Sequence, residues 1–236
     1  MRAYVFSGIG LYALFLAATM PATLLDGFSN HFSKGIVRFS EAQGTIWHGS
    51  ATLGIQGQAA GRFSWKIAPA EIAIGRLHVS LEGEKERGDL VLTPSKLELA
   101  RLSLSLPASL LGLLDKRLES IRPGGEIHVQ SEDFMLSNIA RGEIVAQWDN
   151  ANSPLVRVDP LGSYRIHAYG QASKLGLSLE TLHGPLFLKG SCSWSRNSGL
   201  QFSGTGESKE EGLSGLLRIA GPAQGNGVYS ISLSAS

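Results

Sequence analysis

The sequence predicts a mainly β protein, in which an N-terminal transmembrane helix is followed by a curved antiparallel β domain with two or three short helices. Three observations predict this fold. Residues 3–25 carry no charge and are mostly apolar. Beyond Ile36, apolar residues recur mainly at every second position, which is typical of strands with one buried face. Most of the 29 glycines fall between these runs, where they permit turns and bends.

The N-terminal run from Ala3 to Leu25 is long enough to cross a bilayer core of about 30 Å as a helix. Residues 17–22 offer no clean pair of small residues for a leader peptidase, although cleavage of the run as a secretory signal stays the alternative. We therefore expect residues 1–25 to form a signal anchor. Because Arg2 precedes the run, the N-terminus is expected in the cytoplasm and the chain after Asp26 on the other side.

The composition limits how the exported part folds and what it binds. Cys192 is the single cysteine, so no intramolecular disulfide can form and the fold depends on packing. The formal net charge is only +1, so the chain has no overall electrostatic attraction to nucleic acid and no nucleic-acid partner is expected. Residues 26–236 are expected to form one β-rich domain, with a sub-boundary near 122–125 left open.

Strand patterns cover most of this part. Clear examples are 102–106, 175–179 and 229–233, in which small polar residues separate large apolar ones. The charged segment Glu82–Asp89 lies between two such runs and is interpreted as a solvated hairpin tip rather than a docking site. The apolar phase slips between Leu99 and Leu102, which predicts a bulge or corner near Ala100–Arg101.

Three segments are expected to be helical. Pro107–Ser120 has proline at its start, leucines four residues apart and glycines after its end. Pro69–Ile74 is expected to form one short turn, and Glu210–Ile219 a second leucine-bearing helix. The similar stretches Ser109–Leu114 and Gly212–Leu217 each follow a run of strands, which suggests a weak internal duplication.

No pattern of catalytic chemistry is present in the sequence. The six histidines are dispersed, and neither a zinc-binding pair nor a phosphate or dinucleotide loop occurs. Gly212–Leu216 departs from the nucleophile elbow at its last position, and Cys192 has no base or cation nearby in the sequence. We therefore expect a protein that is not an enzyme, with no catalytic, cofactor-binding or metal-binding residues and no cofactor.

Aromatic, glycine and proline residues instead form an ordered series of landmarks. They are Gly44-Thr-Ile-Trp-His-Gly49, Trp65-Lys-Ile-Ala-Pro69, Gly142–Trp148, Pro160-Leu-Gly-Ser-Tyr164 and Gly184-Pro-Leu-Phe-Leu-Lys-Gly190. Read from the residues alone, Trp47 and Trp65 are expected in the core, Pro160–Gly162 in a turn, and Tyr164 as the first inward residue of the next strand.

The order of these landmarks, together with the N-terminal run, resembles the N protein family of the bacterial type II secretion system. The resemblance extends from the anchor to about Leu233. It implies an accessory, non-enzymatic protein anchored in the inner membrane by a single span, with its bulk in the periplasm. It also implies partners among the other secretion proteins, either the outer-membrane secretin or the inner-membrane platform.

Two functions agree with the sequence. In the first, the β domain docks on a component of the secretion apparatus, for example by lending a sheet edge to a partner strand. In the second, an anchored curved sheet with a leucine-lined groove binds or moves lipids or other hydrophobic ligands. Alternation alone does not distinguish a filled core from an open groove.

Overall fold

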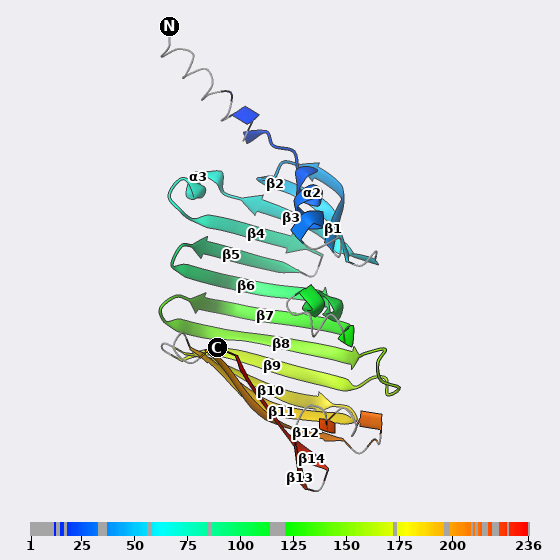
Figure 1. Cartoon of the computed structure of the whole chain (residues 1–236). Helices are drawn as coiled ribbons and strands as arrows, with labels where there is room; N and C mark the ends of the chain where they lie inside the picture. The colour runs from blue at the N-terminus through cyan, green and yellow to red at the C-terminus, as the bar shows by residue number, and fades with distance from the viewer. Residues whose placement is uncertain are drawn as a thin grey trace. The chain divides into compact units, whose positions relative to one another are not determined.

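The structure is a computed structural model, and it confirms that the chain is mainly β. It describes residues 12, 15–16, 18–32, 37–55, 58–84, 86–113, 121–171, 174–195, 199–208, 210, 212–213, 217–218, 222–225 and 227–235. The chain packs as two compact units, Met1–Glu86 and Arg87–Ser236. The described residues form fourteen strands, antiparallel to their partners, with a few short helices (Figure 1).

The first unit combines four strands with two helices. In chain order these are α2 (Leu24–Phe32), β1 (Val37–Gly44), β2 (His48–Ile55), β3 (Gln58–Ile67), α3 (Pro69–Ile72) and β4 (Leu77–Gly83). Each strand pairs with the next strand in the chain. The expected short turn at Pro69–Ile74 is therefore present as α3, with proline in its first turn.

The second unit contains the remaining strands. They are β5 (Arg87–Thr93), β6 (Lys96–Pro107), β7 (Gly124–Leu136), β8 (Ala140–Asn152), β9 (Gly162–Gln171), β10 (Lys174–His183), β11 (Leu186–Ser195), β12 (Gly199–Ser208), β13 (Ala223–Gly225) and β14 (Val228–Ala235). A 3-10 helix, η1 (Ala108–Leu113), follows β6. Pairing follows chain order from β5 to β12, after which β14 lies between β12 and β13.

The buried core of the first unit is small and centres on Trp65. Its ring packs with Ala22 and Ala51, and Trp65 itself is 6% exposed. The indole Nε1 donates a hydrogen bond to the Ile46 carbonyl at 3.0 Å, which satisfies the polar end of the buried ring. Gly49 is required beside it, because a Cβ at that position would lie 2.7 Å from the ring.

The prediction that Trp47 is a core residue was wrong. Its side chain is only half-buried, and its carbonyl accepts a hydrogen bond from the Ile67 amide at 2.6 Å. Trp47 lies in the short connection between β1 and β2, whereas Trp65 lies within β3. Position within a strand therefore decided which indole was buried.

The end of the N-terminal apolar run belongs to the folded first unit. The Ile46 amide donates to the Met20 carbonyl at 2.9 Å, and the Ala22 amide donates to the Gly44 carbonyl at 3.0 Å. Ala22 is 1% exposed within the core. No helix in the part of the chain that the structure describes is long and apolar enough to cross a membrane. Much of the predicted span lies outside the described residues, so the transmembrane helix remains a prediction.

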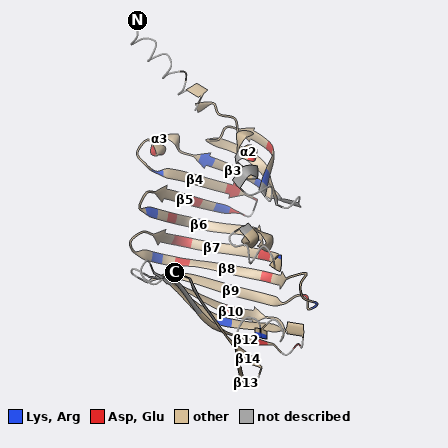
Figure 2. Ribbon diagram, in the orientation of Figure 1, with Lys and Arg blue, Asp and Glu red and all other residues tan. Residues whose placement is uncertain are grey.

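Cross-strand register in the second unit separates an apolar face from a polar one. Leu104, Val129, Ala146 and Ile166 lie opposite one another on β6 to β9, so these apolar residues share one face. The adjacent row of Ser105, His128, Gln147 and Arg165 lies on the other face. The alternation in the sequence thus predicted the two faces correctly. Charged residues of both signs are interspersed along the strands (Figure 2).

The bulge predicted near Ala100–Arg101 is confirmed. Arg87 pairs with Ser103 and Asp89 with Ala100, so the single residue Gly88 faces two residues of β6. Arg101 adopts a positive φ of 50° there. Strand β4 ends at Gly83 and β5 begins at Arg87, so only residues 84–86 of the segment Glu82–Asp89 lie between the two strands. Glu82 belongs to β4 and Asp89 to β5, where the Asp89 carboxylate forms an ion pair with Arg101, so the solvated tip is shorter than expected.

The helix predictions met different outcomes. Pro107 is the last residue of β6, paired with Glu126, and the described part of the expected helix is a 3-10 helix rather than an α-helix. Residues 114–120 lie outside the described residues. In the segment 210–219, Leu213 and Leu217 are helical and buried, while the intervening residues are not described. The suggested duplication remains a prediction.

Tyr164 is buried in β9, as expected for the first inward residue of that strand, but Pro160 and Leu161 form no regular turn and Gly162 is already the first residue of β9. It is 3% exposed, and its hydroxyl lies 3.2 Å from the Leu161 carbonyl and 3.1 Å from the Leu186 carbonyl. Burial raises the pKa of Tyr164 to about 12, so the hydroxyl keeps its proton and can donate at neutral pH. The residue thereby ties the β8–β9 connection to β11.

We expect Trp65→Ala to destabilise the protein by roughly 3–5 kcal/mol, because it removes a large buried ring and leaves a cavity. Trp47→Ala should cost clearly less, because that side chain is already half-exposed. Urea unfolding of the full chain in detergent measures both changes. Equal losses for the two variants would show that Trp47 is as important to the core as Trp65.

Candidate functional site

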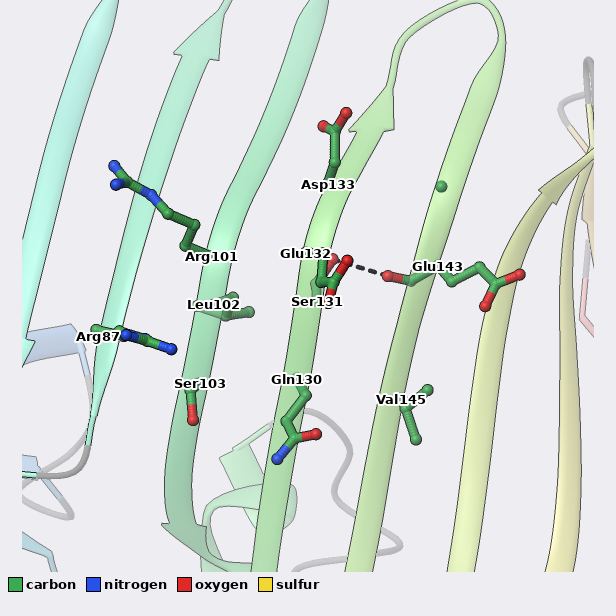
Figure 3. Close-up of a pocket in the computed structure, with 11 residues that line it drawn as sticks. Arg87, Arg101, Leu102, Ser103, Gln130, Ser131, Glu132, Asp133, Glu143 and Val145 are labelled. Carbon is green, nitrogen blue, oxygen red and sulfur yellow. Dashed lines mark hydrogen bonds between the residues drawn. The ribbon is translucent and has the colours of Figure 1, made fainter.

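A hollow with a volume of about 900 Å³ lies on strands β5 to β8 (Figure 3). Charged and polar side chains dominate its lining. The lining residues are Arg87, Arg101, Leu102, Ser103, Gln130, Ser131, Glu132, Asp133, Gly142, Glu143 and Val145. The hollow is open to solvent, so it is a surface site rather than an enclosed cavity.

Two bulges shape this hollow. On β6, Arg101 and Leu102 oppose Gly88, and a Cβ on Gly88 would lie 2.7 Å from Leu102 Cδ1. On β7, the pairing moves from Gln130 with Val145 to Phe134 with Gly142, so three residues of β7 face two of β8. A bulge bends its strand and leaves ladder groups unpaired, which opens a depression in an otherwise continuous sheet.

Ser131 and Gly142 fix the second bulge. The Ser131 hydroxyl, buried in the bulge, donates to the Glu143 carbonyl at 2.7 Å (Figure 3). Gly142 has a φ of 84°, and a Cβ there would lie 1.9 Å from the Asp133 carbonyl oxygen. Only glycine fits both the backbone conformation and this close approach.

The charges around the hollow are mixed. Arg101 Nη2 pairs with Asp89 Oδ2 at 2.5 Å, and Glu143 Oε2 lies 3.1 Å from His167 Nε2. Glu132 and Asp133 are exposed. In Figure 3 the two arginines lie on one side of the acidic residues. The hollow therefore suits a polar segment with charges of both signs better than a small apolar ligand.

A row of Ser105, His128 and Asp149 crosses β6, β7 and β8. Ser105 Oγ lies 2.7 Å from His128 Nδ1, but His128 Nε2 lies 3.6 Å from Asp149 Oδ2, which is beyond hydrogen-bond reach. Both Asp149 oxygens instead accept hydrogen bonds from Gln147 Nε2. The row lies outside both hollows described here. It is therefore interpreted as a polar ladder on the sheet, not as a catalytic triad.

The other residues considered for chemistry are dispersed. Within the described residues, no three His, Cys, Asp or Glu side chains are grouped so that they could hold a metal ion. Cys192 is half-buried on β11, and burial raises the pKa of its thiol, which disfavours the reactive thiolate. Gly212 and Leu213 are helical, a setting unlike the strand-to-helix turn of a nucleophile elbow.

A second, smaller hollow of about 430 Å³ lies on strands β10 to β14. Phe187 lines it and is 48% exposed. Its remaining lining residues are Glu180, Thr181, Leu188, Lys189, Thr205, Glu207 and Val228. Val228 begins β14, so this hollow lies beside the last full strand pair of the unit.

Neither hollow was predicted from the sequence, although the landmarks Gly142–Trp148 and Gly184–Gly190 contain residues that line the first and the second hollow, respectively. The signal that could have located the first hollow was the phase slip at Ala100–Arg101, which marks one of its two bulges. The partner bulge on β7 has a comparable signal, because the apolar positions change phase between Ile127 and Val129 before it and Phe134 and Leu136 after it.

Comparison with known proteins identifies one family. The family model described as type II secretion system (T2SS), protein N, matches residues 36–232. No curated protein and no solved structure matches the chain.

We expect Gly142→Ala to lower the free energy of unfolding of the second unit by more than roughly 3 kcal/mol, which is the upper end of the range for most point mutations. The added Cβ would clash with the Asp133 carbonyl. Gly225→Ala is the matched control. Gly225 also has a positive φ, 104°, but no atom lies within 4 Å of a Cβ there. Urea unfolding of the full chain compares them, and equal losses would show that the bulge relaxes without cost.

Proposed function

The chain belongs to the type II secretion system protein N family, and from that premise we propose that it is an inner-membrane-anchored accessory component whose β domain docks on other secretion proteins. Membership of the family places the chain in type II secretion and associates it with the cell envelope. The docking mode, the partner and the membrane topology are the proposed parts.

The proposed anchor is the stretch from Ala3 to Thr19. These seventeen residues reach the lower limit of roughly 17 for a spanning helix. The anchor ends there because Met20–Ala22 joins the first unit through backbone hydrogen bonds. Signal cleavage after Ala22 would remove a core residue, which supports retention of the segment. Arg2 before the run supports a cytoplasmic N-terminus and a periplasmic β domain.

The observation that carries the docking proposal is the outer edge of β14. Strand β13 is three residues long and pairs only with Val228 and Tyr229. Beyond Ser230, no described strand pairs with the outer side of β14. A row of unpaired backbone donors and acceptors is a template for an added strand from a partner.

The hydrogen bonds indicate which groups of β14 face outward. The Ser230 amide donates to the Pro222 carbonyl at 2.9 Å, on the side away from β12. Backbone groups alternate in direction along an antiparallel strand, so the amides of Ser232 and Ser234 also point outward. Those of Ile231 and Leu233 then point toward β12, their ladder partner.

The edge of β1 differs because it is covered. Asp26 of α2 accepts a hydrogen bond from the Phe39 amide at 2.9 Å, and Pro21 forms a β-bridge with Thr45. Covering an edge with a helix or a neighbouring segment is a usual way to prevent unwanted strand addition. The described part of β14 has no comparable cover beyond Ser230, which supports its use as the docking edge.

The alternative, a lipid-binding or lipid-moving protein, stays a prediction with less support. A groove or cavity that binds an acyl chain needs a mostly apolar lining. The two hollows described above are open and have charged or polar residues in their linings. The docking function is therefore the proposal that the geometry supports best.

A proline at an outward position should block strand addition while leaving the β12–β14 ladder intact. We expect Ser232→Pro to abolish crosslinking between β14 and the secretion components, because proline removes an outward amide donor. A photoreactive residue at Ser230 in native membranes, followed by mass spectrometry, provides the readout. Before the proline change, peptides of the secretin or of the inner-membrane platform should be captured.

Leu233→Pro is the control for simple unfolding. It removes an amide that points toward β12, so it should destabilise the strand pair, whereas Ser232→Pro should leave urea unfolding nearly unchanged. Capture of secretion components that persists in the stable Ser232→Pro protein would refute docking through this edge.

Retention of the N-terminal segment is tested directly. We expect peptides from residues 1–19 to be present in protein isolated from membranes, and the protein to resist extraction by alkaline carbonate. Protein that begins after residue 19 and is released by carbonate would instead establish a cleaved signal.

A further inference from the structure

The connection between β3 and β4 exposes more apolar side chains than a solvated turn needs. Ile72 is 43% exposed and Ile74 is 71% exposed. Helix α3 buries none of its residues, and the positions from Pro69 to Arg76 are all exposed except Glu71. Two large aliphatic side chains thus project from a short, defined helical turn that leaves them without cover.

The single acidic group of this connection is neutralised locally. Glu71 Oε2 lies 3.5 Å from Arg76 Nε, and Glu71 Oε1 lies 3.3 Å from His78 Nδ1. Pairing removes the main electrostatic barrier to placing the turn in a less polar medium. The exposed part that remains is aliphatic.

This connection lies at the end of the first unit where the N-terminal segment joins it. The Ile46 amide donates to the Met20 carbonyl at 2.9 Å, and the Ile67 amide donates to the Trp47 carbonyl at 2.6 Å. Ile46 and Trp47 are adjacent, and Ile67 is followed at once by Ala68 and Pro69. Two backbone contacts therefore connect the end of the apolar run to the start of α3.

We propose that residues 69–74 form a membrane-contacting turn that inserts Ile72 and Ile74 into the interfacial zone of the bilayer. The inference rests on the proposed anchor, which would hold this end of the first unit against the membrane with no intervening linker. A tethered contact needs little affinity of its own, because the anchor supplies a high effective concentration. Aliphatic side chains at the boundary between headgroups and acyl chains are typical of such interfacial elements.

A protein partner fits this surface less well. Stable protein interfaces bury about 800 Å² on each side and centre on aromatic or arginine anchors. The turn has no aromatic residue, and its one arginine is paired with Glu71. Two aliphatic side chains beside an anchor suit a fluid bilayer, which requires no shape complementarity.

Site-specific fluorescence in the full chain tests the proposal. In a Cys192→Ser background, Ile74→Cys carries an environment-sensitive NBD label, and the protein is reconstituted in vesicles of phosphatidylethanolamine and phosphatidylglycerol. We expect a blue-shifted emission and strong quenching by lipids with spin-labelled acyl chains. Leu92→Cys, at a position that is 44% exposed on β5, is the matched control and should give neither effect.

A third label separates this inference from the proposed anchor. Phe15→Cys lies within the predicted span and should be quenched by the same lipids. Quenching at position 15 without quenching at position 74 would overturn the membrane-contacting turn and leave the anchor intact. Loss of quenching at both positions would remove the anchor as well. Shielding of position 74 from aqueous iodide in native membranes, but not in the vesicles, would assign the turn to a protein partner and overturn the inference.

Discussion

Backbone pairing between strands that are neighbours in sequence is the constraint on which the rest of this structure depends. Among the described residues, large buried side chains are few, and the buried aromatic ones are Trp65, Phe134 and Tyr164. The strands are nevertheless long, with thirteen residues in β7 and in β8. Ladder hydrogen bonds and half-buried leucines therefore hold the sheet together, with a smaller contribution from a deep core.

This construction explains where the sheet is irregular. A long, regular strand offers a flat surface, and local extra residues are needed to create a recess. The bulges of β6 and β7 lie next to each other on adjacent strands, because Leu102 pairs with Ser131. Their combined bend produces the charged hollow lined by Arg87 and Glu143. Gly142 permits that bend because it lets the Asp133 carbonyl approach closely. Ser131 stabilises it by donating a hydrogen bond to the Glu143 carbonyl.

The same construction makes the sheet edges the sensitive places. At β1, Asp26 and the Met20–Ala22 segment cover the edge and connect the apolar N-terminus to the Trp65 core. At β14, the three residues of β13 cover only the beginning of the strand. A protein that contributes to a multi-component secretion apparatus can use an edge of this kind because strand addition supplies many backbone hydrogen bonds without deforming either partner.

The sequence by itself determined the β class, the two faces of the second unit, the bulge near Arg101, the burial of Tyr164 and the family. These predictions follow from the spacing of apolar residues, from the turn-forming residues and from the order of the landmark motifs along the chain. All three can be read directly from the sequence. Only the tertiary structure decided that Trp65 rather than Trp47 is buried, that Ala22 belongs to the core, and that Ser131 lies beside Glu143. Each of these depends on which distant residues a strand register places opposite one another. Periodicity defines the face of a strand on which a residue lies, but it does not define what covers that face.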